Sequence, residues 1–266
     1  MTIPTITTLR GKCALITGST QGLGLAAAEQ FAAAGCHVVL NGLGEAAAIE
    51  QARERISRTH GVRVEYHGTN LRDPAGIERL MADVLQSFGA VDILVNNAVV
   101  RHTAPIDQFP VSQWDEAIAV NLSAAFHTIR LALPSMRARR WGRIINVSSI
   151  YGWRGAANRV SYVTTKTALI GLTRAVALET VGDHITCNAV CPGTTDTPLH
   201  RQTIDRMVAE GLTREDAERR FFAGKQPSGR FIPAHDVAAL MLFLCSDEAA
   251  NITGAALPVD AAWAAM

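Results

Sequence analysis

The chain alternates short apolar runs, rich in β-branched residues, with longer Ala-rich stretches in which apolar positions recur at helical spacing. This alternation is typical of repeated βα units, in which each strand is followed by a helix that crosses back over the sheet. The runs at 93–95 and 144–147 lack polar alternation, as expected for strands covered by helices on both faces. The pattern predicts an α/β fold, with one Rossmann-like, doubly wound parallel sheet of about seven strands.

The predicted elements follow one another along the whole chain. Predicted strands span residues 12–17, 36–41, 62–68, 91–96, 142–148, 184–190 and 256–259. Predicted helices span residues 22–34, 45–59, 74–88, 111–139, 160–181 and 233–246. Because no internal repeat or low-complexity linker divides this series, we predict a single domain over residues 1–266.

Residues 194–232 interrupt the alternation. The segment begins after a Pro192-Gly193 turn, carries one charged helical pattern over 203–220 and ends at the turn 227–229. It follows the carboxyl end of a predicted strand, where open α/β sheets bind ligands, and we interpret it as a helical substrate lid. The alternative is a solvated helical insertion with no part in binding.

Composition restricts the class of protein further. The chain has 266 residues, of which 48% are apolar and 18% charged, and its formal net charge is +1. These values exclude disordered and fibrous chains, and the scattered basic residues provide no surface for nucleic acid. No window approaches the roughly 18 apolar residues of a membrane span, and the N-terminus has no pattern of a secretion signal. We expect a cytoplasmic protein whose partners are small molecules and copies of itself.

The five cysteines predict no disulfide framework and no metal site. They are odd in number and form no C-x-x-C pair, and no His or Cys cluster accompanies Cys187 and Cys191. We expect reduced, buried thiols.

A glycine-rich turn directly follows the first predicted strand. It reads Thr17-Gly18-Ser19-Thr20-Gln21-Gly22-Leu23-Gly24 and leads into an Ala-rich helix. Glycine allows a sharp turn and a close approach to a pyrophosphate, while the helix N-terminus supplies free N–H groups. A glycine turn between a strand and a helix can be a simple connection, but its place at the first βα turn favours dinucleotide binding.

The end of the second predicted strand bears on the choice of dinucleotide. Asn41 stands there, and its amide can bond a ribose hydroxyl. No Arg or Lys lies between Asn41 and Glu50 to pair with a 2′-phosphate, which favours NAD, although Asn41 does not repel NADP. Asn70, after the third strand, is placed to offer its amide to adenine; the alternative is an ordinary turn asparagine.

Candidate catalytic residues occur in the second half of the chain. Tyr162 and Lys166 stand four apart in a predicted helix and therefore share a face, and Ser149 ends the preceding strand. A nearby ammonium favours the phenolate of a tyrosine, whose ordinary pKa is about 10. In this arrangement Ser149 bonds the substrate oxygen, Tyr162 takes its proton and a nicotinamide takes its hydride. The Tyr-x-x-x-Lys spacing alone also occurs by chance in many helices.

Together with the glycine turn, Asn96-Asn97-Ala98 and Asn121, these residues identify a family. The chain resembles the short-chain dehydrogenase/reductase family over essentially its whole length. The resemblance implies a catalytic tetrad in which Asn121 holds a water that relays protons from Lys166, and Lys166 also bonds the nicotinamide ribose. It further implies a homotetramer packed through residues 111–139 and 160–181. The implied tetrad is Asn121, Ser149, Tyr162 and Lys166.

The resemblance also implies the rest of the cofactor site. Asn97 packs beside the cofactor, and Thr195 and Thr197 hold the carboxamide and phosphates. Val99 departs from the family pattern, because a glycine usually stands there. The predicted cofactor-binding residues are Gly18, Thr20, Gln21, Gly22, Leu23, Gly24, Asn41, Asn70, Leu71, Asn97, Ala98, Tyr162, Lys166, Pro192, Gly193, Thr195 and Thr197.

Within the family, the chain is similar to bacterial 3-hydroxybutyrate dehydrogenases, for example at 141–146, 191–193 and 225–228. The residues at the positions of their substrate pocket differ. Where those enzymes bind the substrate carboxylate with Gln, His, Lys and Gln, this chain has Arg101, Tyr151, Arg159 and Thr203. Thr194 replaces a tryptophan of the methyl pocket. The predicted substrate-binding residues are Arg101, Ser149, Tyr151, Arg159, Thr194, Thr203 and Trp263.

These differences lead to three hypotheses. The first is an NAD-dependent dehydrogenase of an anionic hydroxy acid, 3-hydroxybutyrate-like or larger, or of a sulfonate analogue, because arginines bind such groups bidentately. The second is a sugar, polyol or cyclic-alcohol dehydrogenase, in which Tyr151, Thr194, Thr203 and His102 bond hydroxyls. The third is a non-catalytic NAD-binding protein, which the complete tetrad disfavours.

Overall fold

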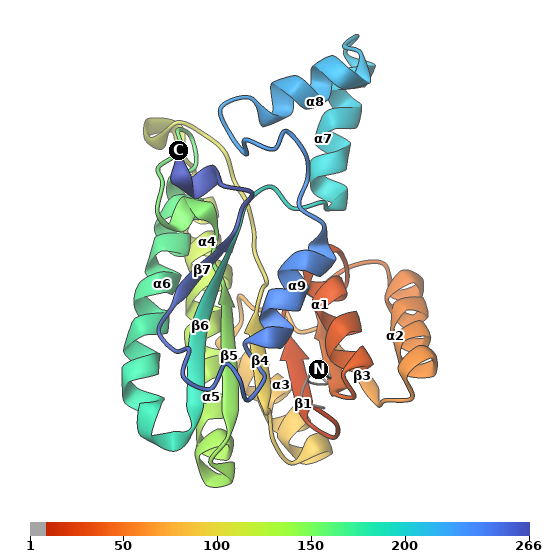
Figure 1. Cartoon of the computed structure of the whole chain (residues 1–266), viewed down its shortest axis with the longest axis vertical. Coiled ribbons are helices and arrows are strands. Elements are labelled where there is room, and N and C mark those ends of the chain that lie inside the picture. The colour runs from red at the N-terminus through yellow and green to blue at the C-terminus, as the bar shows by residue number, and fades with distance from the viewer. Residues whose placement is uncertain (1–8) are drawn as a thin grey trace, which may run out of the picture.

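The computed structural model of the chain describes residues 9–266. Its seven strands form a single parallel sheet in the order β3-β2-β1-β4-β5-β6-β7 (Figure 1). The strands are β1 (Cys13–Ile16), β2 (His37–Asn41), β3 (Val64–His67), β4 (Ile93–Asn96), β5 (Gly142–Val147), β6 (Ile185–Pro192) and β7 (Ala256–Val259). The strand order reverses between β1 and β4, which is the point where doubly wound sheets bind their ligands. The predicted fold class is confirmed.

Helices cover both faces of this sheet. They are α1 (Gly22–Ala33), α2 (Ala46–His60), α3 (Pro74–Phe88), α4 (Val111–Ile118), α5 (Ala124–Arg139), α6 (Val160–Thr180), α7 (Pro198–Ala209), α8 (Arg214–Phe222) and α9 (Ala234–Phe243). Side chains of α1, α2 and α9 share one buried cluster with the sheet, and those of α3, α5 and α6 share the cluster on the opposite face. The apolar runs without polar alternation are therefore strands buried on both sides.

The helix predicted over 111–139 is continuous but not regular. Between α4 and α5 it contains a π-helical turn at Ala119–Ser123, in which the Ala124 N–H donates to the Ala119 carbonyl. By length and hydropathy this stretch could span a membrane, so the expectation that no window approaches such a span is wrong. It is a core helix of the domain, because α5 packs on β4, β5 and α3 and contributes to the second cluster.

The single charged helix predicted over 203–220 is wrong. Two helices, α7 and α8, replace it, because Gly211 adopts a φ of +105° that ends the first. Thr213 begins the second, since its Oγ1 accepts the Asp216 N–H at 3.1 Å. The pair stands beyond the carboxyl ends of the strands (Figure 1) and has a small core of its own. That core consists of Ile204, Ala217, Phe221 and Phe222.

A buried polar network joins the central strands to α5 and α6. The Asn96 Nδ2 donates to Asn146 Oδ1 at 2.9 Å, and the Asn146 Nδ2 donates to Thr173 Oγ1 at 2.9 Å. Thr128 Oγ1 donates to Asn96 Oδ1 at 2.7 Å. Because each side chain in the network is hydrogen-bonded to another, the network fixes the register between the sheet and α6, the helix that carries Tyr162.

Replacing Asn146 with alanine is therefore expected to lower the free energy of unfolding by about 2 to 4 kcal/mol, because it leaves a buried Asn96 donor unpaired and opens a cavity. Urea unfolding followed by circular dichroism measures this loss. Asn251→Ala, at an exposed asparagine, is the control and should change stability little. Equal stability of the two variants would contradict the role of the network.

All five cysteines are buried and free, as predicted. Burial raises the pKa of the Cys36 thiol and of the Cys187 thiol to about 12. Among residues 9–266, no three His, Cys, Asp or Glu side chains gather as a metal site would require.

Candidate active site

A cleft of about 560 Å³ opens at the carboxyl ends of the strands. Its walls are formed by the first βα turn, the segments after β2, β4, β5 and β6, and the start of α7. Every predicted cofactor-binding residue lines this cleft, as do Arg101 and Ser149. The remaining predicted site residues lie outside its lining: Asn121, Tyr151, Arg159, Thr194, Thr203 and Trp263.

The glycine turn has no room for side chains. Gly18 has a φ of +63°, and a Cβ there would lie 2.7 Å from Ala98 Cα. A Cβ at Gly24 would overlap the Gly18 carbonyl oxygen and lie 2.8 Å from Ser19 Cα. Asn97 fixes the same turn, since its Nδ2 donates to the Thr17 and Gly18 carbonyls at 3.0 and 2.9 Å. Asn97 therefore holds the glycine turn in shape and lines the cleft beside it.

The start of α1 fits an anionic group. The side chain of its N-cap residue, Gln21, does not cap the first turn, and no acidic residue lies in that turn. Among residues 9–266 its first N–H groups therefore have no side-chain acceptor, and they border the cleft. The helix dipole favours negative charge at this end. The turn and the helix start therefore fit the pyrophosphate of a dinucleotide.

The adenosine side of the cleft gives Asn41 a narrower role than expected. This side chain is fully buried, and its Nδ2 already donates to the His67 and Thr69 carbonyls at 2.9 and 3.1 Å. Its Oδ1 is buried and has no partner among the described residues. The prediction that the Asn41 amide is offered to a ribose hydroxyl is therefore not supported, because both of its polar atoms are buried and its nitrogen holds the segment after β3. Asn70 is exposed in the cleft, and its Oδ1 accepts the Arg72 N–H at 3.1 Å.

Tyr162 and Lys166 lie together on α6 beneath the cleft, and both are buried. The Lys166 Nζ donates to the Val147 carbonyl at 2.6 Å and lies 5.7 Å from the centroid of the Tyr162 ring. Ser149 begins the turn after β5, where its Oγ accepts the Tyr151 N–H at 3.2 Å. It lies close enough to Tyr162 to help lower the pKa of that hydroxyl. The structure brings the predicted Ser, Tyr and Lys together.

Electrostatics prepare Tyr162 for proton transfer. Burial alone would raise the pKa of its hydroxyl, but the cations Arg101 and Lys166 and the hydrogen bonds with Ser149 and Arg101 bring that pKa below its ordinary value. Burial lowers the pKa of the Lys166 ammonium, although the adjacent Tyr162 opposes this shift. With Tyr162 as the predicted proton acceptor, oxidation of an alcohol needs the ionised phenol, and we expect its rate to rise with pH through the lowered pKa of Tyr162.

Asn121 lies in the π-helical turn and is buried. Its Oδ1 accepts the Val100 N–H at 2.8 Å, and its Nδ2 donates to the Val100 carbonyl at 3.0 Å. The side chain therefore holds the loop after β4.

Of the other predicted substrate residues, some lie near Tyr162 and one lies away from the cleft. The Tyr151 ring packs edge-on against Tyr162 and Trp263, with centroids at 6.1 and 5.4 Å, and the three form an aromatic wall. Thr194 is buried, and its N–H donates to Gln226 Oε1 at 2.7 Å. Thr203 is not brought to the cleft, because its Oγ1 donates to the Leu199 carbonyl one turn earlier in α7.

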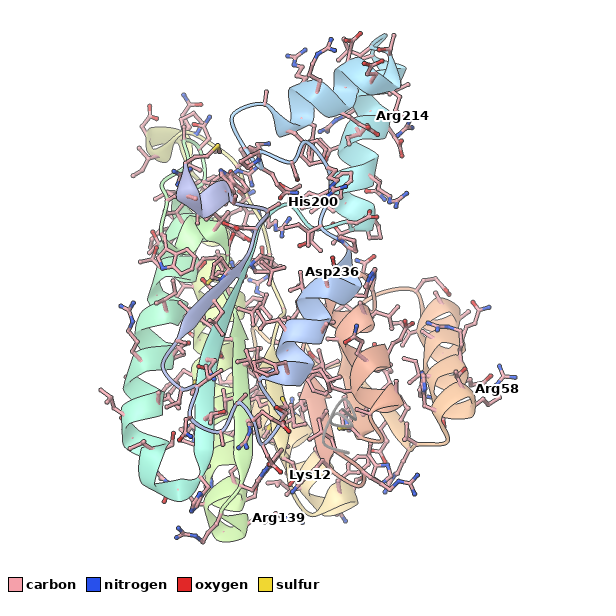
Figure 2. All side chains as sticks on the ribbon, in the orientation of Figure 1. Lys12, Arg58, Arg139, His200, Arg214 and Asp236 are labelled. Atoms are coloured by element: carbon pink, nitrogen blue, oxygen red, sulfur yellow. The ribbon has the colours of Figure 1, made fainter. Side chains whose placement is uncertain are left out.

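His200 lines the cleft in place of Thr203, and the sequence analysis missed it. Figure 2 shows it near the start of α7, between that helix and the strand ends. Its Nδ1 lies 2.7 Å from the Thr195 carbonyl and its Nε2 lies 3.2 Å from Arg101 Nη1. Burial lowers the pKa of the imidazole, and the hydrogen bond to Thr195 opposes this shift. A single histidine in a charged helix carries no spacing signal, so only the fold could reveal its position.

Three cations gather near the substrate side. Arg159 acts electrostatically on Tyr151, His200 and Lys225, and the Lys225 ammonium lies 4.8 Å from the Phe221 ring centroid. Burial and Arg159 lower the pKa of Lys225. None of the ion pairs formed by residues 9–266 involves Arg101, Arg159 or Lys225. This side of the site is therefore positively charged without an acidic partner.

The family model for short chain dehydrogenase matches residues 12–207. The D-beta-hydroxybutyrate dehydrogenase of Cupriavidus necator is 44% identical over 259 residues, covering 97% of this chain and 99% of that protein. A 3-oxoacyl-[acyl-carrier-protein] reductase of Aquifex aeolicus is 35% identical over 253 residues, with 95% and 97% covered. The crystal structure of L-sorbose reductase from Gluconobacter frateurii, complexed with NADPH and L-sorbose, superposes with a TM-score of 0.94 at 30% identity, covering 98% of this chain and 100% of that chain.

The chain belongs to the short-chain dehydrogenase family. It is an oxidoreductase that acts on the CH–OH group of a small molecule with NAD(P). Over nearly its whole length it is related to D-beta-hydroxybutyrate dehydrogenases, of which that of Rhizobium meliloti is 42% identical.

Proposed function

We propose that the protein is an NAD-dependent dehydrogenase that interconverts a small anionic hydroxy acid, or a sulfonate analogue, and the corresponding ketone. The observation that carries this proposal is a group of three cations, Arg101, Arg159 and Lys225, which have no acidic partner among residues 9–266. Of the three, Arg101 lies directly beside Tyr162. An anionic substrate would compensate these charges, and its hydroxyl would lie toward Tyr162.

Each residue of the site has a separate role in the proposed reaction. Ser149 bonds the substrate oxygen and Tyr162 takes its proton, while Lys166 favours the ionised Tyr162. When bound, the nicotinamide supplies the acceptor for the hydride. Arg101 and Arg159 orient the anionic end of the substrate, so that the alcohol carbon lies at a fixed place above the cofactor cleft.

The relatives support two substrate classes. The names of the D-beta-hydroxybutyrate dehydrogenases favour a hydroxy acid. The L-sorbose reductase, which was crystallised with a neutral sugar, supports a sugar or polyol as the second candidate. In that case the Tyr151 hydroxyl would bond the substrate, and the cations would face solvent.

Arg159→Ala separates these candidates. We expect KM for an anionic hydroxy acid to rise by about ten- to a hundredfold, the equivalent of one lost charge-assisted hydrogen bond, while KM for a neutral alcohol changes little. Steady-state kinetics with both substrates measure the difference. Arg58→Ala is the control, because Arg58 lies on α2 away from the cleft (Figure 2). An equal rise for the acid and the neutral alcohol would remove the argument for an anionic substrate.

The preference for NAD rests on the end of β2. Asn41 and Gly42 line the cleft there, followed by Leu43, which is 61% exposed. None of these residues offers a cation to a 2′-phosphate.

Leu43→Arg is expected to raise kcat/KM with NADP by about tenfold or more, because the added guanidinium pairs with the phosphate. Leu43→Gln, of similar length but uncharged, should leave the preference for NAD in place. If both variants behave like the parent protein with NADP, the 2′-phosphate would lie elsewhere.

The same proposal includes a cytoplasmic homotetramer and a closing lid. Apolar side chains project from the two long helices, with Phe126 on α5 50% exposed and Leu178 on α6 81% exposed. Such exposed apolar residues favour burial between copies of the chain. Because Pro198, Leu199 and His200 line the cleft at the start of α7, a movement of α7 and α8 would close it over the substrate.

A further inference from the structure

Arg101 and His200 meet beside the catalytic tyrosine. The Arg101 Cζ lies 5.3 Å from the centroid of the Tyr162 ring, and its Nη1 lies 3.2 Å from His200 Nε2. Arg101 comes from the loop after β4 and His200 from α7, so two segments far apart in sequence converge on Tyr162. The three residues form a chain of contacts from α7 to the site of proton transfer.

The chemistry of arginine determines the state of His200. A guanidinium can only donate hydrogen bonds, so His200 Nε2 must accept. The proton of the neutral ring therefore lies on Nδ1, which donates to the Thr195 carbonyl at 2.7 Å. The ring also stacks on Phe231 with an interplanar angle of 11° and contacts Phe221. His200 is thus fixed on both edges and on one face.

Arg101 needs this support to remain at Tyr162. It is exposed, and none of the ion pairs of the described residues includes it, so no carboxylate holds its long side chain in place. An unsupported arginine on a loop would sample many rotamers, and its charge would then be screened by water. The His200 acceptor restricts the guanidinium to the Tyr162 side of the cleft.

We propose that His200 is a positioning residue, which in its neutral form holds the Arg101 guanidinium against Tyr162 so that Arg101 favours the ionised phenol. Arg101 thereby supplements Lys166, which acts on Tyr162 from within the same helix. This inference rests on the proposed function in one respect, namely that Tyr162 is the proton acceptor of a short-chain dehydrogenase. It does not depend on the proposed anionic substrate.

The contact between His200 and Arg101 should depend on pH. The charged groups that act on His200 are the cations Arg101, Lys225 and Arg159, while Asp196 faces it as a carboxylate already paired with Arg201. Protonation of His200 removes the acceptor and places a second positive charge beside Arg101. Because burial lowers the pKa of His200, the contact is present at neutral pH and is lost only as the pH falls through that lowered value.

Titration of tyrosinate absorbance in the substrate-free, full-length protein tests the proposal. The chain has three tyrosines, so subtracting the titration of Tyr162→Phe isolates that of Tyr162. We expect Arg101→Gln and His200→Phe to move the Tyr162 titration to higher pH by similar amounts, and the double variant to move it no further. His200→Phe preserves the aromatic packing on Phe231 but has no acceptor.

Two further variants sharpen the result. His200→Gln offers a side-chain oxygen to Arg101 and should bring the Tyr162 titration part of the way back from its position in His200→Phe to that of the parent protein. A purely structural role for the ring would not explain this recovery. Arg159→Gln removes a cation that acts on Tyr151 but not on Tyr162, and it should leave the Tyr162 titration in place. A Tyr162 titration that moves in Arg101→Gln but not in His200→Phe would overturn the positioning role. A titration unmoved in both would overturn the contribution of Arg101 as well.

Discussion

Tyr162→Phe is expected to lower turnover by about a thousandfold while leaving the affinity for NAD nearly unchanged. The substitution keeps the buried ring, its edge-on contact with Tyr151 and the cation beside it, and removes only the hydroxyl. Loss of a positioned acid or base costs about 10² to 10⁴ in rate, and we propose this tyrosine as the proton acceptor of the site. Steady-state kinetics measure the turnover, and quenching of protein fluorescence by NAD measures the affinity.

Tyr66→Phe is the matched control for this substitution. It also removes one phenolic hydroxyl, which donates to the Gly42 carbonyl at 2.8 Å and lies outside the catalytic group. This variant should keep most of the turnover. Turnover retained in Tyr162→Phe would mean that another group takes the proton, and the assigned role of Tyr162 would be wrong.

Gly24→Ala is expected to weaken NAD binding by about ten- to a hundredfold. The added methyl would overlap the Gly18 carbonyl and crowd the Asn97 Nδ2, so the turn that faces the pyrophosphate must shift. Forcing an extra methyl group into a packed position costs about 1 to 3 kcal/mol, which corresponds to this loss of affinity. Calorimetric titration with NAD measures it.

Gly182→Ala separates a local effect on the turn from a general effect of replacing glycine. Nothing lies within 4 Å of a Cβ at Gly182, which is far from the cleft in the turn after α6. This control should bind NAD as the parent protein does. Unchanged affinity in Gly24→Ala would show that the turn does not hold the pyrophosphate.

The fold was predictable because its signals are local or repeated. The strands at 93–96 and 142–147 carry apolar runs without regular polar alternation and are buried throughout. The helix Pro74–Phe88 has the bounds that its sequence predicts, with Asp73 as the N-cap and Gly89 beyond its end. The break between α7 and α8 was missed, because a charged helical pattern continues across Gly211. One glycine with a positive φ overrode that periodicity.

The site residues also differ in whether a local sequence signal predicts them. Gly18, Tyr162 and Lys166 belong to spacings that require a particular geometry, so the sequence places them near one another. Thr203 and His200 lie on one helix, and only the direction in which α7 leaves the sheet decides which of the two faces the cleft. The role of Asn41 could not be predicted from the sequence for a second reason. The hydrogen bonds of its amide to the His67 and Thr69 carbonyls depend on the pairing of β2 with β3.

We propose, as the central point, that this protein interconverts an anionic hydroxy acid and its ketone with NAD. The most direct test follows the appearance of NADH absorbance when the purified protein and NAD are offered 3-hydroxybutyrate, larger hydroxy acids, hydroxysulfonates, neutral sugars and cyclic alcohols, with NADP in parallel. We predict reduction of NAD in preference to NADP, with a carboxylate or sulfonate as the best substrate. Activity with neutral sugars or cyclic alcohols alone would contradict the claim and would mean that Arg101, Arg159 and Lys225 do not bind the substrate.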